Sequence, residues 1–69
     1  MNEDALNMEI RKFLKKVGIT SQREIEKAIT NALSSGKLHG KSNLQVSMQL
    51  HIQELGLSHD IDGVITISE

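Results

Sequence analysis

The period of the hydrophobic pattern changes at Leu44, and this change limits the fold more than any other feature of the sequence. From Leu44 to Ile52 every second residue is apolar and the residues between are polar, which is the pattern of a strand with one face in water. Before Leu44 the apolar residues recur at the three- and four-residue spacing of an amphipathic helix. The sequence therefore predicts an α+β protein with its helices first and its strands last.

Two amphipathic helices are predicted before the strands. The first spans about 4–17, and Gly18 is a residue type that often ends a helix. The second spans about 21–35, because Ser21 and Glu24 have the S-x-x-E spacing of a capping box. The short connection between them predicts a helical hairpin or a corner like that of a helix-turn-helix.

A β-hairpin is predicted after the helices, with strands at about 44–53 and about 58–67. The apolar residues of the second strand also alternate with polar ones. Both apolar sets lie on one face of the hairpin if residues 54–57 form the loop and Gly56 supplies a positive φ.

These elements predict a single domain, residues 1–69, in which two helices pack on one face of the hairpin (order ααββ). A chain of 69 residues without cysteine has a small core and no disulfide to support it. A two-stranded sheet is also marginal alone and has unpaired edges. We therefore expect a homodimer, formed through a strand edge or through Met8, which lies off the main apolar side of the first helix.

The sequence contains no arrangement of residues typical of an enzyme, and no cofactor is expected. The absence of cysteine excludes thiol catalysis, and no serine lies in a G-x-S-x-G motif. No apolar run approaches the roughly 20 residues of a membrane span. The N-terminus MNEDALNMEI is acidic where a signal peptide is basic. A cytoplasmic protein is expected.

The basic residues are segregated, since all eight lie between Arg11 and Lys41. Two helices followed by a two-stranded wing would be partly winged-helix-like, and such a fold binds DNA with its second helix. A sequence pI of about 6.3 argues against a nucleic-acid binder, and a solvated helix surface explains the charges equally. The candidate nucleic-acid-binding residues are Gln22, Arg23, Lys27, Thr30, Lys12, Lys15 and Lys16.

The segment LHIQELGLSHDIDG contains the candidate metal ligands His51, Asp60 and Asp62. In the predicted register all three lie on the polar face of the hairpin, with His51 opposite Asp60, whereas His59 lies on the apolar face. Imidazole nitrogen and carboxylate oxygen both suit zinc. The alternative is a solvated cross-strand pair of histidine and aspartate, and the H-E-x-x-H spacing of zinc enzymes is absent.

Three segments resemble a family of short bacterial proteins of unknown function: RKFLKKVGITSQREIEKAI, GKLHG at Gly36–Gly40, and LGLSHDIDGVI from Leu55. The resemblance covers nearly the whole chain. It implies a small cytoplasmic protein of two helices and a hairpin, and it supplies no activity, ligand or site. The small core, the open strand edges and the lack of a catalytic arrangement predict a non-enzymatic protein-interaction module that binds itself or another protein.

Overall fold

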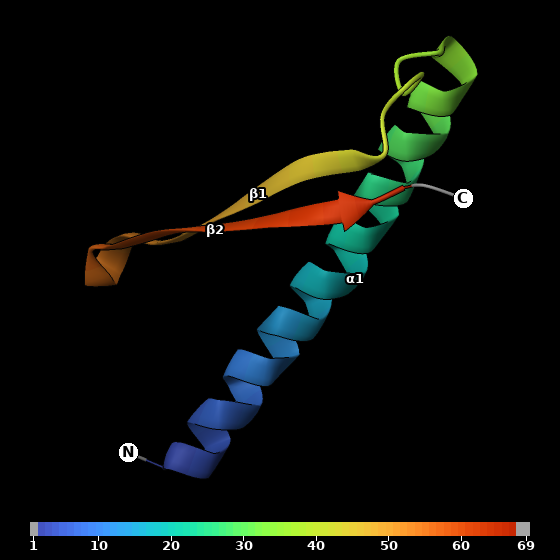
Figure 1. Cartoon of the computed structure of the whole chain (residues 1–69). Coiled ribbons are helices and arrows are strands. Elements are labelled where there is room, and N and C mark those ends of the chain that lie inside the picture. Colours follow the sequence, from blue (N-terminus) through green and yellow to red (C-terminus); the bar gives the residue numbers. More distant parts are fainter. Residues whose placement is uncertain (1, 68–69) are drawn as a thin grey trace. The chain divides into compact units, whose positions relative to one another are not determined.

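The computed structural model describes residues 2–67, and the chain divides into two compact units, Met1–Lys37 and Leu38–Glu69. The protein is α+β, as predicted, with one long helix followed by an antiparallel hairpin (Figure 1). The packing of helix on hairpin within a single domain stays a prediction. The elements in chain order are α1 (Glu3–Ser35), β1 (Asn43–Ile52), the one-turn 3-10 helix η1 (Gln53–Leu55) and β2 (Leu57–Thr66).

α1 is one continuous helix where the sequence predicted two, so the predicted ααββ order is wrong. Gly18 lies inside α1 without a positive φ, and Ser21 and Glu24, the predicted capping box, also lie inside it. A glycine inside a helix costs only about 0.5–1 kcal/mol relative to alanine. No proline is present to remove a backbone N–H. The helix therefore continues through Gly18 for 33 residues.

The two predicted apolar faces are in phase, which explains why one helix can carry both. Along α1 the positions of this face follow one another in steps of four, four and three residues. Eleven residues in three turns is close to the helical period of 3.6, so the positions line up almost parallel to the helix axis. We call this row the helix stripe; it consists of Leu6, Ile10, Leu14, Val17, Ser21, Ile25, Ala28 and Ala32.

Both ends of α1 have local capping interactions. At the start, Asn2 Oδ1 accepts a hydrogen bond of 3.1 Å from the Ala5 backbone N–H, which satisfies one of the free donors of the first turn. At the end, Gly36 adopts the left-handed conformation with φ 78°, and the Lys37 N–H donates to the Ala32 carbonyl at 3.0 Å. This is the Schellman pattern, and it ends the helix at Gly36.

β1 and β2 pair in a register that differs by two residues from the predicted one. Ile52 pairs with Leu57, so the loop is 53–56 and starts one residue earlier than predicted. Gly56 has φ 63°, the positive value predicted for it. Its N–H donates to the Gln53 carbonyl at 3.1 Å, which makes Gly56 the last residue of the turn rather than an inner one. The shift changes every cross-strand pair and leaves each side chain on its predicted face.

The two faces of the hairpin differ in polarity, as the alternating pattern predicted. On the polar face, Thr66 Oγ1 donates a hydrogen bond to Asn43 Oδ1 at 3.3 Å. Val64 is an apolar residue on this face and lies opposite Gln45. His59 lies on the other face, opposite Leu50. Apart from His59 and Gly63, that apolar face of the two strands consists of Leu44, Val46, Met48, Leu50, Ile52, Leu57, Ile61 and Ile65.

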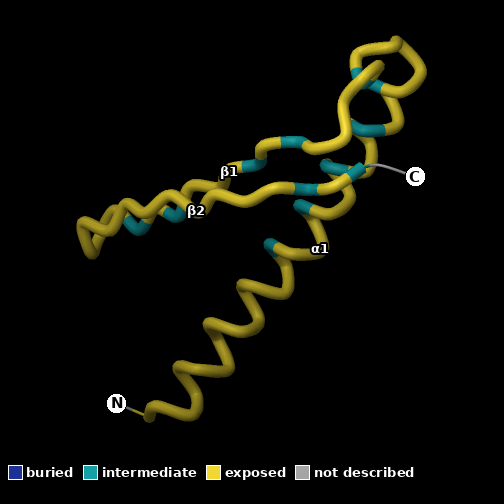
Figure 2. The backbone as a smooth tube through the Cα atoms, viewed as in Figure 1, coloured by how far each residue is buried: buried dark blue, intermediate teal, exposed yellow. Residues whose placement is uncertain are grey.

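None of the residues from 2 to 67 is buried, and most of the backbone belongs to exposed residues (Figure 2). A single helix and a two-stranded sheet each lack a second layer against which to bury an apolar side. Neither unit therefore has a core of its own. The exposed large hydrophobic residues, all at least 37% exposed, are Leu6, Met8, Ile10, Phe13, Leu14, Ile19, Leu33, Met48, Leu55, Leu57, Ile61 and Val64.

Candidate interaction surfaces

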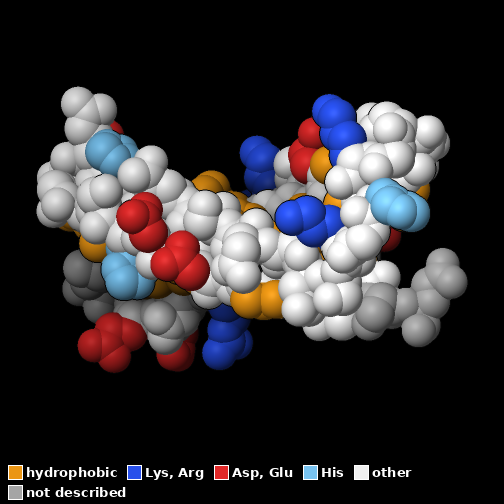
Figure 3. Space-filling view, turned by 45° about the horizontal axis from the view of Figure 1, so that its top comes forward, with side chains coloured by type: hydrophobic (Ala, Val, Ile, Leu, Met, Phe, Trp, Pro, Cys, Tyr) orange, Lys and Arg blue, Asp and Glu red, His pale blue; other side chains and the backbone are white. Residues whose placement is uncertain are grey.

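The helix stripe is an apolar surface that runs along most of α1. Its N-terminal residues are open to solvent, with Leu14 55% exposed, and Phe13 beside the stripe is 56% exposed. Hydrophobic side chains reach the molecular surface among polar ones (Figure 3). Isolated helices gain little from propensity alone, and most helical stability in proteins comes from packing of an apolar side. The helix stripe is therefore a candidate interaction surface.

The basic residues of α1 gather on the side away from the stripe. At 3.6 residues per turn, Lys12, Lys16, Arg23 and Lys27 lie within about 60° of one another around the helix axis; we call these four the basic row. The structure thus places on one helix face two groups that were predicted on separate helices. All seven candidate nucleic-acid-binding residues are exposed, including Lys15, Gln22 and Thr30 on the flanks of this row.

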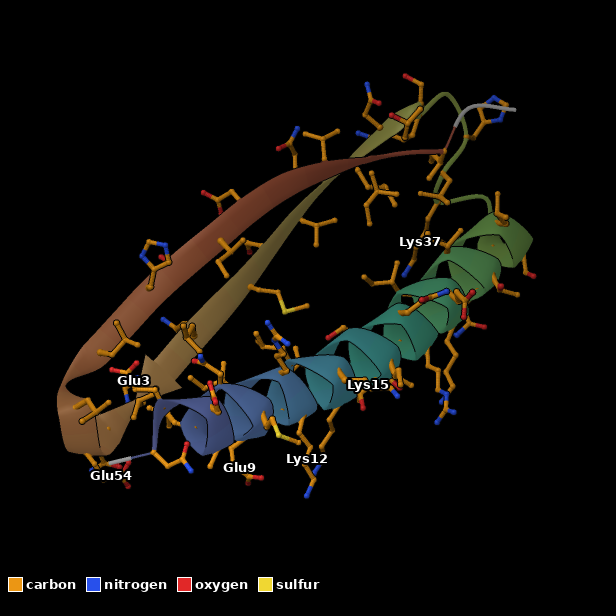
Figure 4. The ribbon with its side chains drawn as sticks, turned by 90° about the horizontal axis from the view of Figure 1, so that it is seen from below. Glu3, Glu9, Lys12, Lys15, Lys37 and Glu54 are labelled. Atoms are coloured by element: carbon orange, nitrogen blue, oxygen red, sulfur yellow. The ribbon has the colours of Figure 1, made fainter. Side chains whose placement is uncertain are left out.

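Carboxylates interrupt the basic row. Glu9 projects from the same side of α1 as Lys12 (Figure 4). Lys27 Nζ lies 3.5 Å from Glu24 Oε2, with both side chains about 70% exposed, and a pair so exposed contributes little to stability. Glu26 accepts a hydrogen bond from Gln22 at 3.5 Å. These carboxylates therefore offset part of the positive charge of this side.

The winged-helix-like prediction is wrong in its helical part. A helix-turn-helix needs two helices that meet at a turn, whereas the part of the chain that the structure describes contains one α-helix. Gln22, Arg23 and Thr30, predicted to face a DNA groove from a recognition helix, lie instead in the middle and last third of α1. The structure contains the predicted two-stranded hairpin but, in its described part, not the two helices beside which the wing of a winged helix lies.

The candidate metal ligands share the polar face of the hairpin without facing one another. His51 lies opposite Ser58, and the predicted pairing of His51 with Asp60 is wrong because the register is shifted. Asp60 lies opposite Gln49, and Asp62 opposite Ser47. All three are exposed. Within residues 2–67 no group of three or more histidine, aspartate or glutamate side chains is close enough to hold a metal ion.

The two free edges of the hairpin differ in charge. β1 and β2 form a two-stranded sheet, so within the described residues each strand has one unpaired edge. β2 carries Asp60 and Asp62, whereas β1 contains no aspartate, glutamate, lysine or arginine over its ten residues. Natural proteins protect edge strands with charges, proline or bulges, and β1 has none of these. The uncharged run from Asn43 to Ile52 is the sequence signal that points to this edge.

A helix of 33 residues followed by a hairpin with ten-residue strands defines a small α+β protein. The chain matches the family of unknown function DUF6494 over residues 1–68 and belongs to it. This confirms the resemblance to a family without an assigned function. Searches of curated proteins and of solved structures found no match. Among the described residues, no helix is long and apolar enough to cross a membrane.

Proposed function

We propose that this protein is a non-enzymatic interaction module that associates with itself. The observation that carries the proposal is that none of the residues from 2 to 67 is buried while large hydrophobic side chains are exposed in both units. Contiguous exposed apolar surface on a soluble protein marks a site of interaction. A helix without packing and a hairpin of two strands are each marginal in water, so association supplies the burial that they lack.

The lengths of the elements support the same conclusion. The helix stripe, from Leu6 to Ala32, is about 39 Å long at the helical rise of 1.5 Å per residue, and a strand of ten residues is about 33 Å long. Each apolar surface is therefore long enough for an extended contact with a second polypeptide. Within residues 2–67, the outer edges of both strands are also unpaired. We infer that a second polypeptide covers part of these surfaces.

Sedimentation equilibrium of the full chain tests this proposal. We expect a mass of twice the 7.7 kDa of one chain at micromolar to millimolar concentration, because an obligate small domain buries its apolar surface by dimerising. A mass of 7.7 kDa at every concentration, including the millimolar end, would contradict self-association.

Nucleic-acid binding is a second candidate, which the basic row favours because its four cations lie on one face of one helix. Each phosphate that a cation neutralises releases counterions, so binding would weaken steeply with salt. Replacing both Arg23 and Lys27 by alanine should reduce the slope of log K against log salt for a duplex by about 2, at roughly 0.9 for each phosphate that is no longer neutralised. Absence of binding to a duplex even at low salt would eliminate this candidate.

A further inference from the structure

We propose that the partner of the free β1 edge is a second copy of this chain, which pairs antiparallel with it through β1. The product is a four-stranded sheet in the order β2-β1-β1-β2, with a two-fold axis through Met48. The inference rests on the proposed self-association and adds the surface, the direction and the register.

Charge decides between the two edges. If two copies paired through β2 with Ile61 on the axis, Asp60 of each copy would lie opposite Asp62 of the other, and like charges directly opposite destabilise a strand pair. If one copy is shifted by two residues along the other, Asp60 or Asp62 lies opposite the same residue of the second copy, depending on the direction of the shift. Two β1 strands bring together no aspartate, glutamate, lysine or arginine. The β1 edge therefore accepts an identical strand without like charges opposite one another, whereas each of these three β2 registers brings aspartates together.

The hydrogen-bond phase of the hairpin shows which backbone groups point to the free edge of β1. The Ile67 N–H donates to the Ser42 carbonyl at 2.9 Å, so Ser42 and Ile67 form a hydrogen-bonded pair. Such pairs alternate with non-bonded pairs along an antiparallel ladder, and the ladder is continuous from Asn43 to Ile52. The even-numbered residues of β1 therefore bond β2, and the N–H and C=O groups of the odd-numbered residues face outward.

The register follows from the apolar face. A pairing that keeps apolar residues on one face must match even positions with even positions. With Met48 opposite itself, Leu44 lies opposite Ile52 of the second copy and Val46 opposite Leu50. This is the register in which all five apolar residues of β1 meet apolar partners. If the two copies are shifted by two residues so that the axis passes through Ser47, Ile52 lies opposite Ser42 of the second copy.

The polar face is compatible with the same register. Gln45 lies opposite His51 of the second copy, and Ser47 opposite Gln49. All four side chains carry both a donor and an acceptor in their neutral forms. Their outward backbone groups supply the new ladder bonds, while the Met48 pair falls at a non-bonded position, where the Cα atoms of opposite residues are about 4.5 Å apart.

Cysteine cross-linking tests this register, because the natural chain contains no cysteine. We expect full-length Met48→Cys to form a covalent dimer in a glutathione redox buffer, since a disulfide requires Cα atoms within about 7 Å. Ile61→Cys is the matched control on the same apolar face, directly across the hairpin from Met48. In the proposed sheet the two copies of residue 61 are separated by three strand spacings, about 14 Å, so this variant should stay uncrosslinked.

A mixing experiment fixes the register independently of position 48. Val46→Cys and Leu50→Cys should each remain monomeric on a non-reducing gel when oxidised alone and should form a disulfide when mixed. Suppose that the natural chain sediments as a dimer. The β1 interface is then overturned if Ile61→Cys cross-links, or if neither Met48→Cys nor the mixed pair does. Either result leaves the proposed self-association intact. A natural chain that sediments as a monomer overturns both proposals.

Discussion

Gly18 and Gly36 are chemically identical residues with opposite roles in this chain. Gly18 lies inside α1 with an ordinary helical backbone, and Gly36 ends the helix at φ 78°. A Cβ built on either residue would meet nothing within 4 Å. The backbone conformation alone therefore decides what a side chain would do at each position.

Gly18→Ala should stabilise the protein by about 0.5–1 kcal/mol, because alanine loses less backbone entropy in a helix. Gly36→Ala should destabilise it by about 1–2 kcal/mol, because the left-handed conformation is unfavourable for a residue with Cβ. Urea unfolding followed by far-ultraviolet circular dichroism measures both changes. If Gly18→Ala destabilised the protein as much as Gly36→Ala, α1 would end at Gly18 as a shorter helix.

The candidate site residues show how far single positions can be predicted. The alternating pattern placed His51, Asp60 and Asp62 on the polar face, because face depends only on whether a strand position is odd or even. It could not pair them correctly, because pairing depends on the length and start of the loop. The turn that ends at Gly56 moved every partner by two positions.

At the scale of elements, the amphipathic patterns predicted the helical and strand segments and missed the continuity of α1. The signals at Gly18 and at Ser21 with Glu24 are local, and each is common at helix ends. The phase of the apolar positions on either side of Gly18 is a longer-range signal, since Leu14 and Ile25 are eleven residues apart and lie on the same side of one helix. Nothing on the apolar side required a corner there.

The free edges of the hairpin give a prediction at the same scale. Gln49→Pro removes an N–H that faces the open edge of β1, and proline is tolerated on an edge strand. The hairpin should remain folded by circular dichroism while the sedimentation mass falls from that of a dimer to that of a monomer.

Val64→Pro is the matched control for Gln49→Pro, because the N–H of Val64 faces the open edge of β2 by the same alternation. This variant should remain a dimer. If Val64→Pro dissociated the dimer and Gln49→Pro did not, the second copy would be bound at β2.

At the scale of the whole molecule, two features set the behaviour of the chain. Within residues 2–67 neither unit has a buried core of its own, and one surface of each is apolar over most of its length. Length and composition predicted a small core and association, because a chain of 69 residues buries little surface. The sequence could not show which surfaces stay open, because that depends on the continuity of α1 and on the register of the hairpin.

The concentration dependence of unfolding tests most directly the claim that a second copy completes this fold. Unfolding of a dimer to two chains shifts by mass action, so a hundredfold increase in protein concentration adds about 2.7 kcal/mol to its apparent stability. The urea midpoint should then rise by roughly 1–3 M at ordinary m values. A midpoint that is the same across that hundredfold range would show that one chain is stable alone and would contradict the account.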